Sequence, residues 1–364
     1  MMKRILFLAD INSPHTQKWV SGIAAKGFTA GIFSFAPART DWFKSAGINF
    51  VNEDQFDISS IVNKSRWSKL FYPANIGLLK KCMEKFSPDI LHAHYATSYG
   101  QLGALTRFHP FVISAWGSDV LDFPKKSFLH RGILRRNFYA ADKILSPSIA
   151  LSKEISRHTD KPVEIIPFGI ELDKFKRTDD KAKDRFVIGI IKSLEPYYGI
   201  DNIIRSFKLI SQKYQSMNLR LMIVGDGSQR EKLNRITNEL NLTGKVIFTG
   251  RISQDQVPAM HNQIDIFVNP SYRESLGVSV LESSACEVPV IVSNVGGLPE
   301  VVKDGETGII LNQISPWHIA EAISIFIDNP DRIREYGKQG RRFVEDKFDW
   351  KKILVQISDI YARY

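Results

Sequence analysis

The sequence predicts an α/β protein made of two doubly wound, Rossmann-like domains. Its length of 364 residues is typical of two domains. Short apolar runs that end at Gly, Pro or Asn alternate with longer segments of helical spacing, a pattern that favours parallel sheets covered by helices. This pattern stops at a polar, charged stretch, residues 161–184, and starts again at Phe186. We therefore expect a first domain over residues 1–168, a polar linker, and a second domain over residues 185–345.

Apolar runs mark the expected strands of both domains. In the first domain they cover residues 4–9, 30–35, 48–51, 89–94, 111–115 and 142–148. In the second domain they cover residues 186–191, 219–224, 245–248, 264–268 and 290–292. The turn Gly225–Gly227 follows one of these strands, and Ser228 after it reads as the cap of a helix. We expect this turn to form the floor under a ligand rather than to hold phosphate.

Composition describes an ordinary globular chain, with 43% hydrophobic and 24% charged residues. No apolar run approaches the roughly 18 residues that cross a bilayer, and the apolar start reads as a first strand rather than a signal peptide. The two cysteines, Cys82 and Cys286, lie in apolar helical segments. We expect buried free thiols and a cytoplasmic protein, with a peripheral position on the inner face of the plasma membrane.

The net charge of +10 is concentrated in the first half. Residues 1–170 hold 22 Lys and Arg against 13 Asp and Glu, and the remainder is nearly neutral. Two basic tracts interleaved with aromatic residues stand out: Lys64, Arg66, Trp67, Lys69, Phe71, Tyr72, Lys80, Lys81 and Lys85; and Lys125, Lys126, His130, Arg131, Arg135 and Arg136. They suit an anionic membrane surface, and a solvated charged face is the alternative. Nucleic acid is not an expected partner, because no binding motif accompanies the charge.

The central stretch is a strand at residues 264–268, a polar loop, and a helix expected over 276–286. The first turn of such a helix leaves backbone N–H groups free, and its dipole favours an anion. Gly277 permits close approach of a ligand to the backbone. The sequence therefore predicts a pyrophosphate site at this helix start.

Two carboxylates, Glu274 and Glu282, frame that helix start eight residues apart. A carboxylate beside a phosphate would repel it, so these groups suit hydrogen bonds from sugar hydroxyls. The alternative is an acid that complements the helix dipole together with an exposed helix glutamate.

Several further motifs accompany this stretch. They are Ile165–Phe175, Met222–Gly227, Val246–Gly250, Val292–Val302 and Asp304–Gly308. In this order they resemble the retaining glycosyltransferases of family 4. The resemblance implies the GT-B fold, in which two Rossmann-like domains face each other across a cleft and a C-terminal helix, here residues 350–364, packs on the first domain. It implies transfer of a sugar from a nucleotide diphosphate donor, with a UDP-sugar favoured and GDP-mannose as the alternative. The expected acceptor is a glycan or a lipid-linked molecule of bacterial surface polysaccharide or glycoconjugate assembly.

The resemblance also implies site residues. Glu274 and Lys192 take the catalytic positions. Glu282 is expected at the ribose, and the other donor-binding positions are Ser275, Leu276, Gly277, Val278, Arg273, Gly225 and Arg251. Relatives place Arg and Lys as diphosphate clamps where this chain has Ser193 and Tyr198, and Lys192 is displaced by one residue from the first clamp.

The acceptor side is expected at strand ends of the first domain, with His15, His94, Trp116 and Asp119 as candidates. Relatives commonly have His where this chain has Trp116. A tryptophan can stack on a sugar and donate one N–H, but it cannot carry a proton. His92 and His94 remain at a neighbouring strand end, where one of them faces the ligand or both are core histidines.

No Asp-x-Asp occurs in the chain, so we expect no metal and no cofactor, with the helix dipole and basic side chains holding the leaving group. Two rival functions stay open. One is a nucleotide-sugar-binding protein with impaired catalysis, which the missing His and Arg suggest. The other is an inverting epimerase of the same fold.

Overall fold

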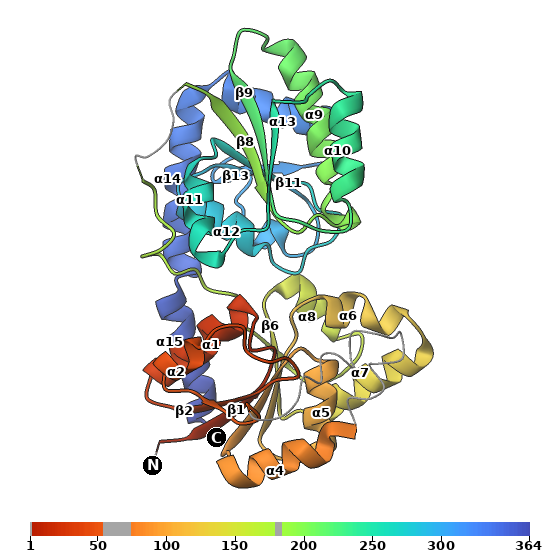
Figure 1. Ribbon diagram of the computed structural model, residues 1–364, viewed down its shortest axis with the longest axis vertical. Coiled ribbons are helices and arrows are strands. Elements are labelled where there is room, and N and C mark those ends of the chain that lie inside the picture. Colours follow the sequence, from red (N-terminus) through yellow and green to blue (C-terminus); the bar gives the residue numbers. More distant parts are fainter. Residues whose placement is uncertain (1, 54–73, 179–183) are drawn as a thin grey trace. The chain divides into compact units, whose positions relative to one another are not determined.

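Parallel strands alternate with helices throughout the computed structural model, which describes residues 2–53, 74–178 and 184–364 (Figure 1). The part of the first basic tract from Lys64 to Tyr72 lies outside the described residues. The chain divides into two units. Unit 1 is Met1–Pro167 with Lys352–Tyr364, and unit 2 is Phe168–Lys351. Each unit has its own parallel sheet.

The sheet of unit 1 has the order β3-β2-β1-β4-β5-β6-β7. Its strands are short, and inner strands such as β1, β4 and β5 are almost fully buried, as expected where helices cover both faces of a sheet. They are β1 (Arg4–Leu8), β2 (Thr29–Phe33), β3 (Asn49–Phe50), β4 (Ile90–His94), β5 (Phe111–Ser114), β6 (Lys143–Ser146) and β7 (Val163–Ile165).

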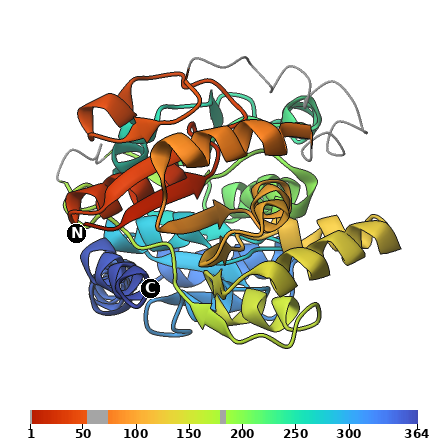
Figure 2. The same ribbon diagram turned by 90° about the horizontal axis from the view of Figure 1, so that it is seen from below.

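The helices of unit 1 connect these strands. They are α1 (Pro14–Ala25), α2 (Trp42–Ser45), α4 (Ile76–Phe86), α5 (Ser98–Thr106), α6 (Ser118–Leu121), α7 (Phe128–Ala140), α8 (Ile149–Ile155) and α15 (Trp350–Ala362). Neighbouring helices pack together, with α5 against both α4 and α7. Helix α7 projects outward from the rest of the unit (Figures 1 and 2).

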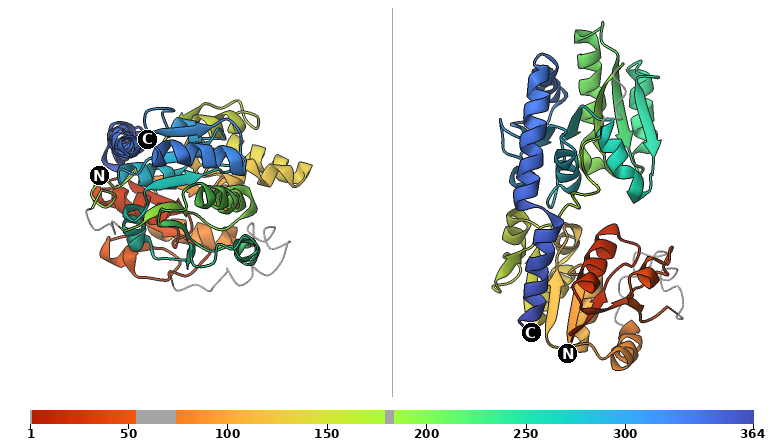
Figure 3. Two further views of the ribbon diagram at one scale, coloured as in Figure 1. Left: turned by 90° about the horizontal axis from the view of Figure 1, so that it is seen from above. Right: turned by 90° about the vertical axis from the view of Figure 1, so that its left-hand side faces the viewer.

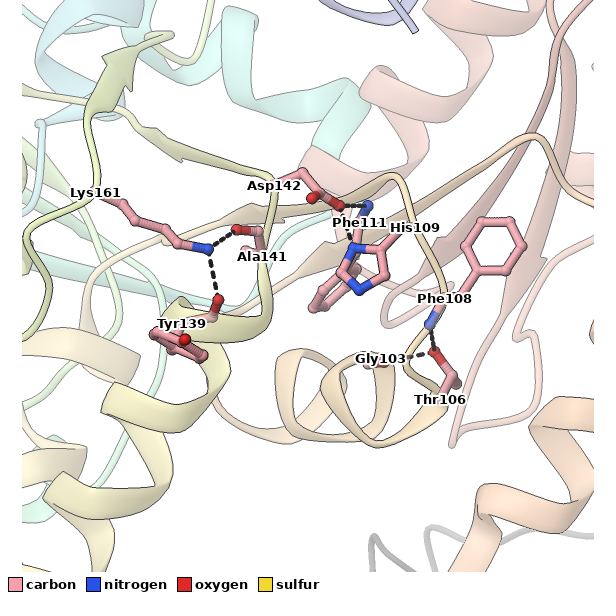
Figure 4. A network of polar contacts seen from close by, with 9 residues as sticks. All are labelled: Gly103, Thr106, Phe108, His109, Phe111, Tyr139, Ala141, Asp142 and Lys161. Carbon is pink, nitrogen blue, oxygen red and sulfur yellow. Dashed lines mark hydrogen bonds and ion pairs between the residues drawn. The ribbon is translucent and has the colours of Figure 1, made fainter.

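Strand β7 corrects the expected linker, because Val163–Ile165 pairs with β6 as the last strand of the first sheet. The three-residue strand is too short for its apolar pattern to stand out. Just before it, Lys161 Nζ donates to the carbonyl oxygens of Tyr139 (2.5 Å) and Ala141 (2.6 Å) (Figure 4). A cation here satisfies carbonyl groups at the end of α7. Nearby, Asp142 accepts from the backbone N–H of Phe111 (2.6 Å) and contacts the His109 ring (2.8 Å).

Helix α15 completes the core of unit 1. Tyr361 is fully buried, and its hydroxyl accepts from Trp19 Nε1 (3.1 Å) and lies 2.5 Å from His92 Nδ1. Lys3 Nζ donates to the carbonyl oxygens of Tyr361 (3.2 Å) and Ala362 (3.0 Å). The two ends of the chain therefore lie side by side, as Figure 3 shows.

The sheet of unit 2 has the order β10-β9-β8-β11-β12-β13. Its strands are β8 (Phe186–Ile191), β9 (Leu219–Val224), β10 (Val246–Gly250), β11 (Ile266–Asn269), β12 (Val290–Ser293) and β13 (Gly308–Leu311). Strand β13 is an addition to the strands expected from the sequence, of which residues 290–292 are the last.

Helices cover both faces of this second sheet (Figure 1). Helices α9 (Ile200–Lys213), α10 (Arg230–Glu239) and α13 (Pro316–Ile327) form one group. Helices α11 (Val257–Asn262), α12 (Val278–Ala285) and α14 (Pro330–Lys347) form the other. Both sheets are thus doubly wound, as the sequence predicts.

Each sheet has one point where the strand order reverses direction. In unit 1 it lies between β1 and β4, and in unit 2 between β8 and β11. At such a point the loops that follow the two strands run to opposite faces, which leaves a crevice at the carboxyl ends of the strands.

Candidate active site

Lys192 and Glu274 form an ion pair at the reversal point of unit 2. Lys192 directly follows β8 and Glu274 lies on the loop after β11, so neighbouring parallel strands deliver them to the same edge. Lys192 Nζ donates to Glu274 Oε2. The side chains are only 12% and 10% exposed, so water screens the pair weakly. The structure brings together the two residues expected to be catalytic.

Two tyrosines surround the Lys192 ammonium group and the neighbouring Arg273. Lys192 Nζ lies 4.6 Å from the ring centre of Tyr198, and Arg273 Cζ lies 4.2 Å from that of Tyr197. Both are cation–π contacts. Burial, reinforced by the charge of Glu274, raises the pKa of Tyr198 far above its ordinary value. The resemblance implies a diphosphate-binding clamp residue at the position of Tyr198. Here the tyrosine ring instead contacts the ammonium group of Lys192.

A glycine pair fixes the loop that carries Glu274. Gly296 has φ +56°, and a Cβ atom there would lie 1.9 Å from the carbonyl oxygen of Glu274. The N–H of Gly297 donates to that same oxygen (3.3 Å). At Gly297, a Cβ would lie 2.4 Å from the carbonyl oxygen of Ser275. Only residues without a side chain let the loop after β12 press against the Glu274 loop.

Helix α12 begins directly after this loop. Its N-cap is Gly277, with φ +103° and no side-chain capping hydrogen bond. The Val280 N–H donates to the carbonyl oxygen of Gly277 (3.0 Å), so an anion at this helix start would be met by the backbone N–H groups before it, at Gly277, Val278 and Ser279. Ser275 and Val278 are half-buried, whereas the Leu276 side chain is 1% exposed and packs in the core. Leu276 thus offers a ligand its backbone only.

The turn after β9 supports the Lys192 loop from below. The Lys192 N–H donates to the carbonyl oxygen of Val224 (2.9 Å), and a Cβ at Gly225 would lie 1.9 Å from the Lys192 carbonyl oxygen. The Gly225 turn thus packs directly against the loop that carries Lys192. Ser228 does not cap α10, however, because its hydroxyl donates to Glu195 (2.6 Å) on the Lys192 loop. Ser228 has a side chain that could cap a helix, but it instead links the turn after β9 to the Lys192 loop.

Glu282 lies inside α12, away from the Lys192 pair. Its Oε2 atom lies 3.5 Å from Nε2 of the fully buried His261 on α11. Burial, followed by the charge of Glu282, raises the pKa of the Cys286 thiol to about 12. Arg251 follows β10 and is exposed, with β9 between β10 and β8. Among the described residues, neither Glu282 nor Arg251 forms a hydrogen bond or ion pair with Lys192 or Glu274.

In unit 1, three candidate side chains meet around Trp116. Its ring centre lies 4.9 Å from that of His94 and 5.9 Å from that of His15. His94 is 2% exposed, its Nδ1 lies 3.4 Å from Thr16 Oγ1, and its Nε2 has no hydrogen-bond partner among the described residues. Burial and the neighbouring His92 and His15 lower the pKa of His94, so its ring stays neutral.

His92 and Asp119 have structural partners. Both ring nitrogens of His92 are used, by Tyr361 and by Ser114 Oγ (2.8 Å). Asp119 is 1% exposed and accepts from the backbone N–H groups of Ala96 (2.7 Å) and Gly117 (2.8 Å). Burial raises the pKa of Asp119 although these hydrogen bonds act in the opposite direction. Its carboxylate fixes the loop that presents Trp116, and it does not extend toward solvent.

Comparison with known proteins identifies the family. The sequence model of glycosyl transferases group 1 matches residues 172–343, and that of the 4-like glycosyl transferases matches residues 4–148. The chain belongs to the group 1 glycosyltransferases. It is therefore a transferase enzyme with the GT-B fold, as its two parallel-sheet units and their structural likeness indicate.

Two relatives and one solved structure illustrate the likeness of this glycosyltransferase. An uncharacterized glycosyltransferase of Methanocaldococcus jannaschii is 27% identical over 78% of this chain and 77% of its own length. A GDP-mannose-dependent alpha-(1-6)-phosphatidylinositol monomannoside mannosyltransferase of Mycolicibacterium smegmatis is 31% identical over 55% of this chain. The match spans little more than half of that relative, 56%. The structure of Anabaena HepE in complex with UDP and glucose has a TM-score of 0.80 and 18% identity, with both chains fully covered.

Sequence reasoning missed three participants. Tyr198 appeared only as a missing clamp, and the aromatic pair before Gly199 was its signal. Gly296 lies in the Val292–Val302 motif, but the sequence assigned it no role. His261 gave no signal at all, because its link to Glu282 depends on how two helices pack.

Among the described residues, no group of three or more His, Cys, Asp or Glu side chains is placed to hold a metal ion, and no helix is long and apolar enough to span a bilayer.

Proposed function

We propose that this glycosyltransferase moves a sugar with retention from a nucleotide diphosphate donor to a glycan or lipid-linked acceptor. The observation that carries the proposal is the Lys192–Glu274 pair beside the uncapped start of α12. A cation, a helix N-terminus and a carboxylate within one loop cluster match the needs of the reaction. The leaving diphosphate is negative, and the sugar carbon becomes positive as it leaves.

Each group has a definite part in this reaction. The bond between the anomeric carbon and the diphosphate oxygen breaks, and a new bond forms to the acceptor oxygen. The acceptor hydroxyl proton passes to the departing diphosphate. Lys192 and the N–H groups at Gly277 and Val278 stabilise the growing negative charge. Glu274 accepts hydrogen bonds from sugar hydroxyls and stabilises positive charge on the ring. Glu282 accepts hydrogen bonds from the ribose.

The donor is proposed to be a UDP-sugar, with GDP-mannose as the alternative. A structural neighbour was solved with UDP and glucose, while the mycobacterial relative is named as GDP-mannose-dependent. A thermal-shift panel of UDP- and GDP-sugars decides between them. Retained transfer after exhaustive chelation would support the proposed metal independence, and activity restored only by Mg²⁺ or Mn²⁺ would contradict it.

The acceptor is proposed to bind in unit 1, where Trp116 and His15 can contact a sugar ring. An anionic membrane is the proposed surface on which a lipid-linked acceptor is met. Helix α7 supports this, because Phe128 is 88% exposed and Tyr139 is 80% exposed beside cationic side chains. The exposed cations are Lys125, Lys126, Arg131, Arg135 and Arg136.

Two variants test the donor assignment. Glu282→Ala should weaken binding of the free nucleoside diphosphate about tenfold or more, since a hydrogen bond to a charged group contributes roughly 1.5–3 kcal/mol. Glu274→Gln should leave that affinity unchanged and reduce transfer about a hundredfold. Glu231→Gln, an exposed change on α10, serves as the matched control.

Calorimetry and a transfer assay on the same preparations give both quantities. Unchanged nucleotide affinity in the Glu282 variant would refute the ribose assignment. A parent protein that binds nucleotide sugars but neither transfers nor hydrolyses them would favour the binding-protein alternative.

A further inference from the structure

His261 is a polar side chain in an apolar place. It lies on α11, is 0% exposed, and packs between Phe267 (ring centres 5.5 Å apart) and Phe175 (6.1 Å). Neither ring nitrogen has a hydrogen-bond partner among the described residues. Burying an imidazole without hydrogen bonds costs free energy, and such a group in a folded protein requires an explanation.

The Glu282 carboxylate explains why an imidazole is buried at this position. His261 Nε2 lies 3.5 Å from Glu282 Oε2, which is within ion-pair reach but longer than a good hydrogen bond. A small rotation of either side chain would close the hydrogen bond. The Glu282 side chain remains 12% exposed, whereas the His261 side chain is 0% exposed, so a ligand can reach Glu282 but not His261.

Helix packing sets this pair. Helix α11 ends at Asn262, just before β11, and α12 follows β11, so both helices lie on the same face of the sheet and pack against each other. A glutamate with free rotation loses side-chain entropy when it binds a ligand. A donor that holds one oxygen in place removes part of that cost and leaves the second oxygen for the ligand.

We propose that His261 is a positioning residue that fixes the Glu282 carboxylate for the ribose hydroxyls of the donor. This proposal rests on the proposed function, because Glu282 is assigned there to the ribose. His261 acts through Glu282 and does not touch the donor. Its contribution therefore belongs to donor affinity and not to the chemical step.

Ribose hydroxyls give the proposal a direct readout. The probe is the nucleoside diphosphate, among UDP, GDP and ADP, that binds the parent protein most tightly, together with its 2′,3′-dideoxy analogue. The ratio of their affinities measures recognition of the hydroxyls. Both ligands are titrated into the same preparation, so a fraction of misfolded protein cancels from the ratio.

Three substitutions of His261 separate positioning from packing. His261→Phe keeps a buried ring and removes the donor. His261→Asn keeps an amide that is too short to reach Glu282. His261→Gln places an amide nitrogen near the position of Nε2 and is the conservative variant.

The parent should prefer the ribonucleotide, and His261→Phe and His261→Asn should each reduce that preference about tenfold. His261→Gln should restore it to within about threefold. In the Phe and Asn variants KM for the donor should rise while kcat at saturating donor stays close to that of the parent. Adding Glu282→Gln to His261→Phe should reduce the ratio no further, because the two residues act as one unit.

Two results would overturn the proposal in distinguishable ways. If the parent prefers the ribonucleotide and His261→Phe keeps that preference, or loses affinity for both ligands equally, His261 is only a packing residue and Glu282 keeps its assignment. If the parent does not distinguish the two ligands, the ribose assignment of Glu282 fails and this proposal fails with it.

Discussion

Lys192 faces two anions in the proposed reaction, and the structure shows how it can serve both. Its ammonium group is paired with Glu274 and rests over the ring of Tyr198. Separating a pair that is shielded from water is costly unless another anion replaces the carboxylate. A diphosphate at the start of α12 is such an anion. We expect the contact with Tyr198 to keep the Lys192 ammonium group at this position when the diphosphate replaces the carboxylate.

At the same scale, His92 predicts an acid-sensitive core. Burial lowers the pKa of His92 from 6.5 to about 3. The unfolded chain therefore binds this proton more readily than the folded chain. The free energy of unfolding should fall as the pH decreases below about 6.5, and the loss should continue toward pH 3, at about 1.4 kcal/mol for each unit of pKa difference. His94, whose pKa is also lowered, adds to the effect.

Urea denaturation of the parent and of His92→Phe at pH 7 and pH 4.5 measures this contribution. The variant loses two hydrogen bonds and should be less stable at pH 7, but the gap should narrow at pH 4.5. Tyr361→Phe is the control, because it removes the hydroxyl beside His92 and keeps the imidazole. A gap between parent and His92→Phe that does not change with pH would contradict the prediction.

At the residue scale, the sequence predicted which residues belong to the candidate site, but it did not predict which side chains contact one another. The family resemblance implied Lys192 and Glu274 as catalytic residues, and parallel pairing of the strands before them brings the two together. Trp116, His94 and His15 likewise follow neighbouring strands. The burial of Asp119 and His92 depends on loop and helix packing, which no local pattern encodes. The same holds for His261, whose partner lies on another helix.

At the scale of elements, Gly296 lets the loop after β12 pack against the loop that carries Glu274. A substitution at this glycine should therefore reduce catalysis although Gly296 has no catalytic role. Gly296→Ala places a Cβ atom against the carbonyl oxygen of Glu274 and must displace one of the two loops. Transfer should fall at least tenfold, since small misplacement of a reacting group is costly. Gly305→Ala is a matched control, because its φ is +74° but no atom lies within 4 Å of the added Cβ.

Gly305→Ala should lose about 1 kcal/mol of stability, the usual cost of a left-handed backbone for residues other than glycine, and Gly296→Ala should lose more because its Cβ atom also displaces a loop. Only Gly296→Ala should lose activity. Melting temperatures and transfer rates of the two variants give the comparison. Equal activity in both would mean that the Glu274 loop tolerates displacement.

Regular elements were the most predictable part of the fold, and their lengths explain the exceptions. Strands of five or six residues such as β1, β8 and β9 consist mostly of apolar residues, which stand out in a sequence. Strand β7 has three residues and no buried position, so its pairing with β6 comes from the sheet rather than from its own pattern. Strand β13 follows a turn rich in glycine, which concealed it.

At the scale of the whole molecule, the uneven charge predicts binding to anionic vesicles. Changing Lys125, Lys126, Arg135 and Arg136 to Gln should weaken binding roughly a thousandfold, since each of the four charges contributes about 1 kcal/mol near a membrane. Co-sedimentation with vesicles of rising anionic-lipid content measures the effect. Binding of the parent should also weaken steeply with salt.

A variant with the same charge change in unit 2 is the control. Lys232, Arg332, Arg334 and Lys338 are exposed there, and their change to Gln should leave vesicle binding close to that of the parent. Equal weakening in both variants would assign the effect to total charge. Binding that ignores lipid charge would leave α7 as a solvated face and favour a soluble acceptor.

The division of unit 1 into two chain segments has a consequence for biosynthesis. The ribosome produces Met1–Pro167 first, then all of unit 2, and only then Lys352–Tyr364. Tyr361, which fills the core beside Trp19 and His92, is made after the whole of unit 2. Domains commonly fold in the order of their synthesis, but here the later domain can finish first. The earlier one stays incomplete on the ribosome, with part of its apolar core uncovered, until its final helix emerges from the exit tunnel.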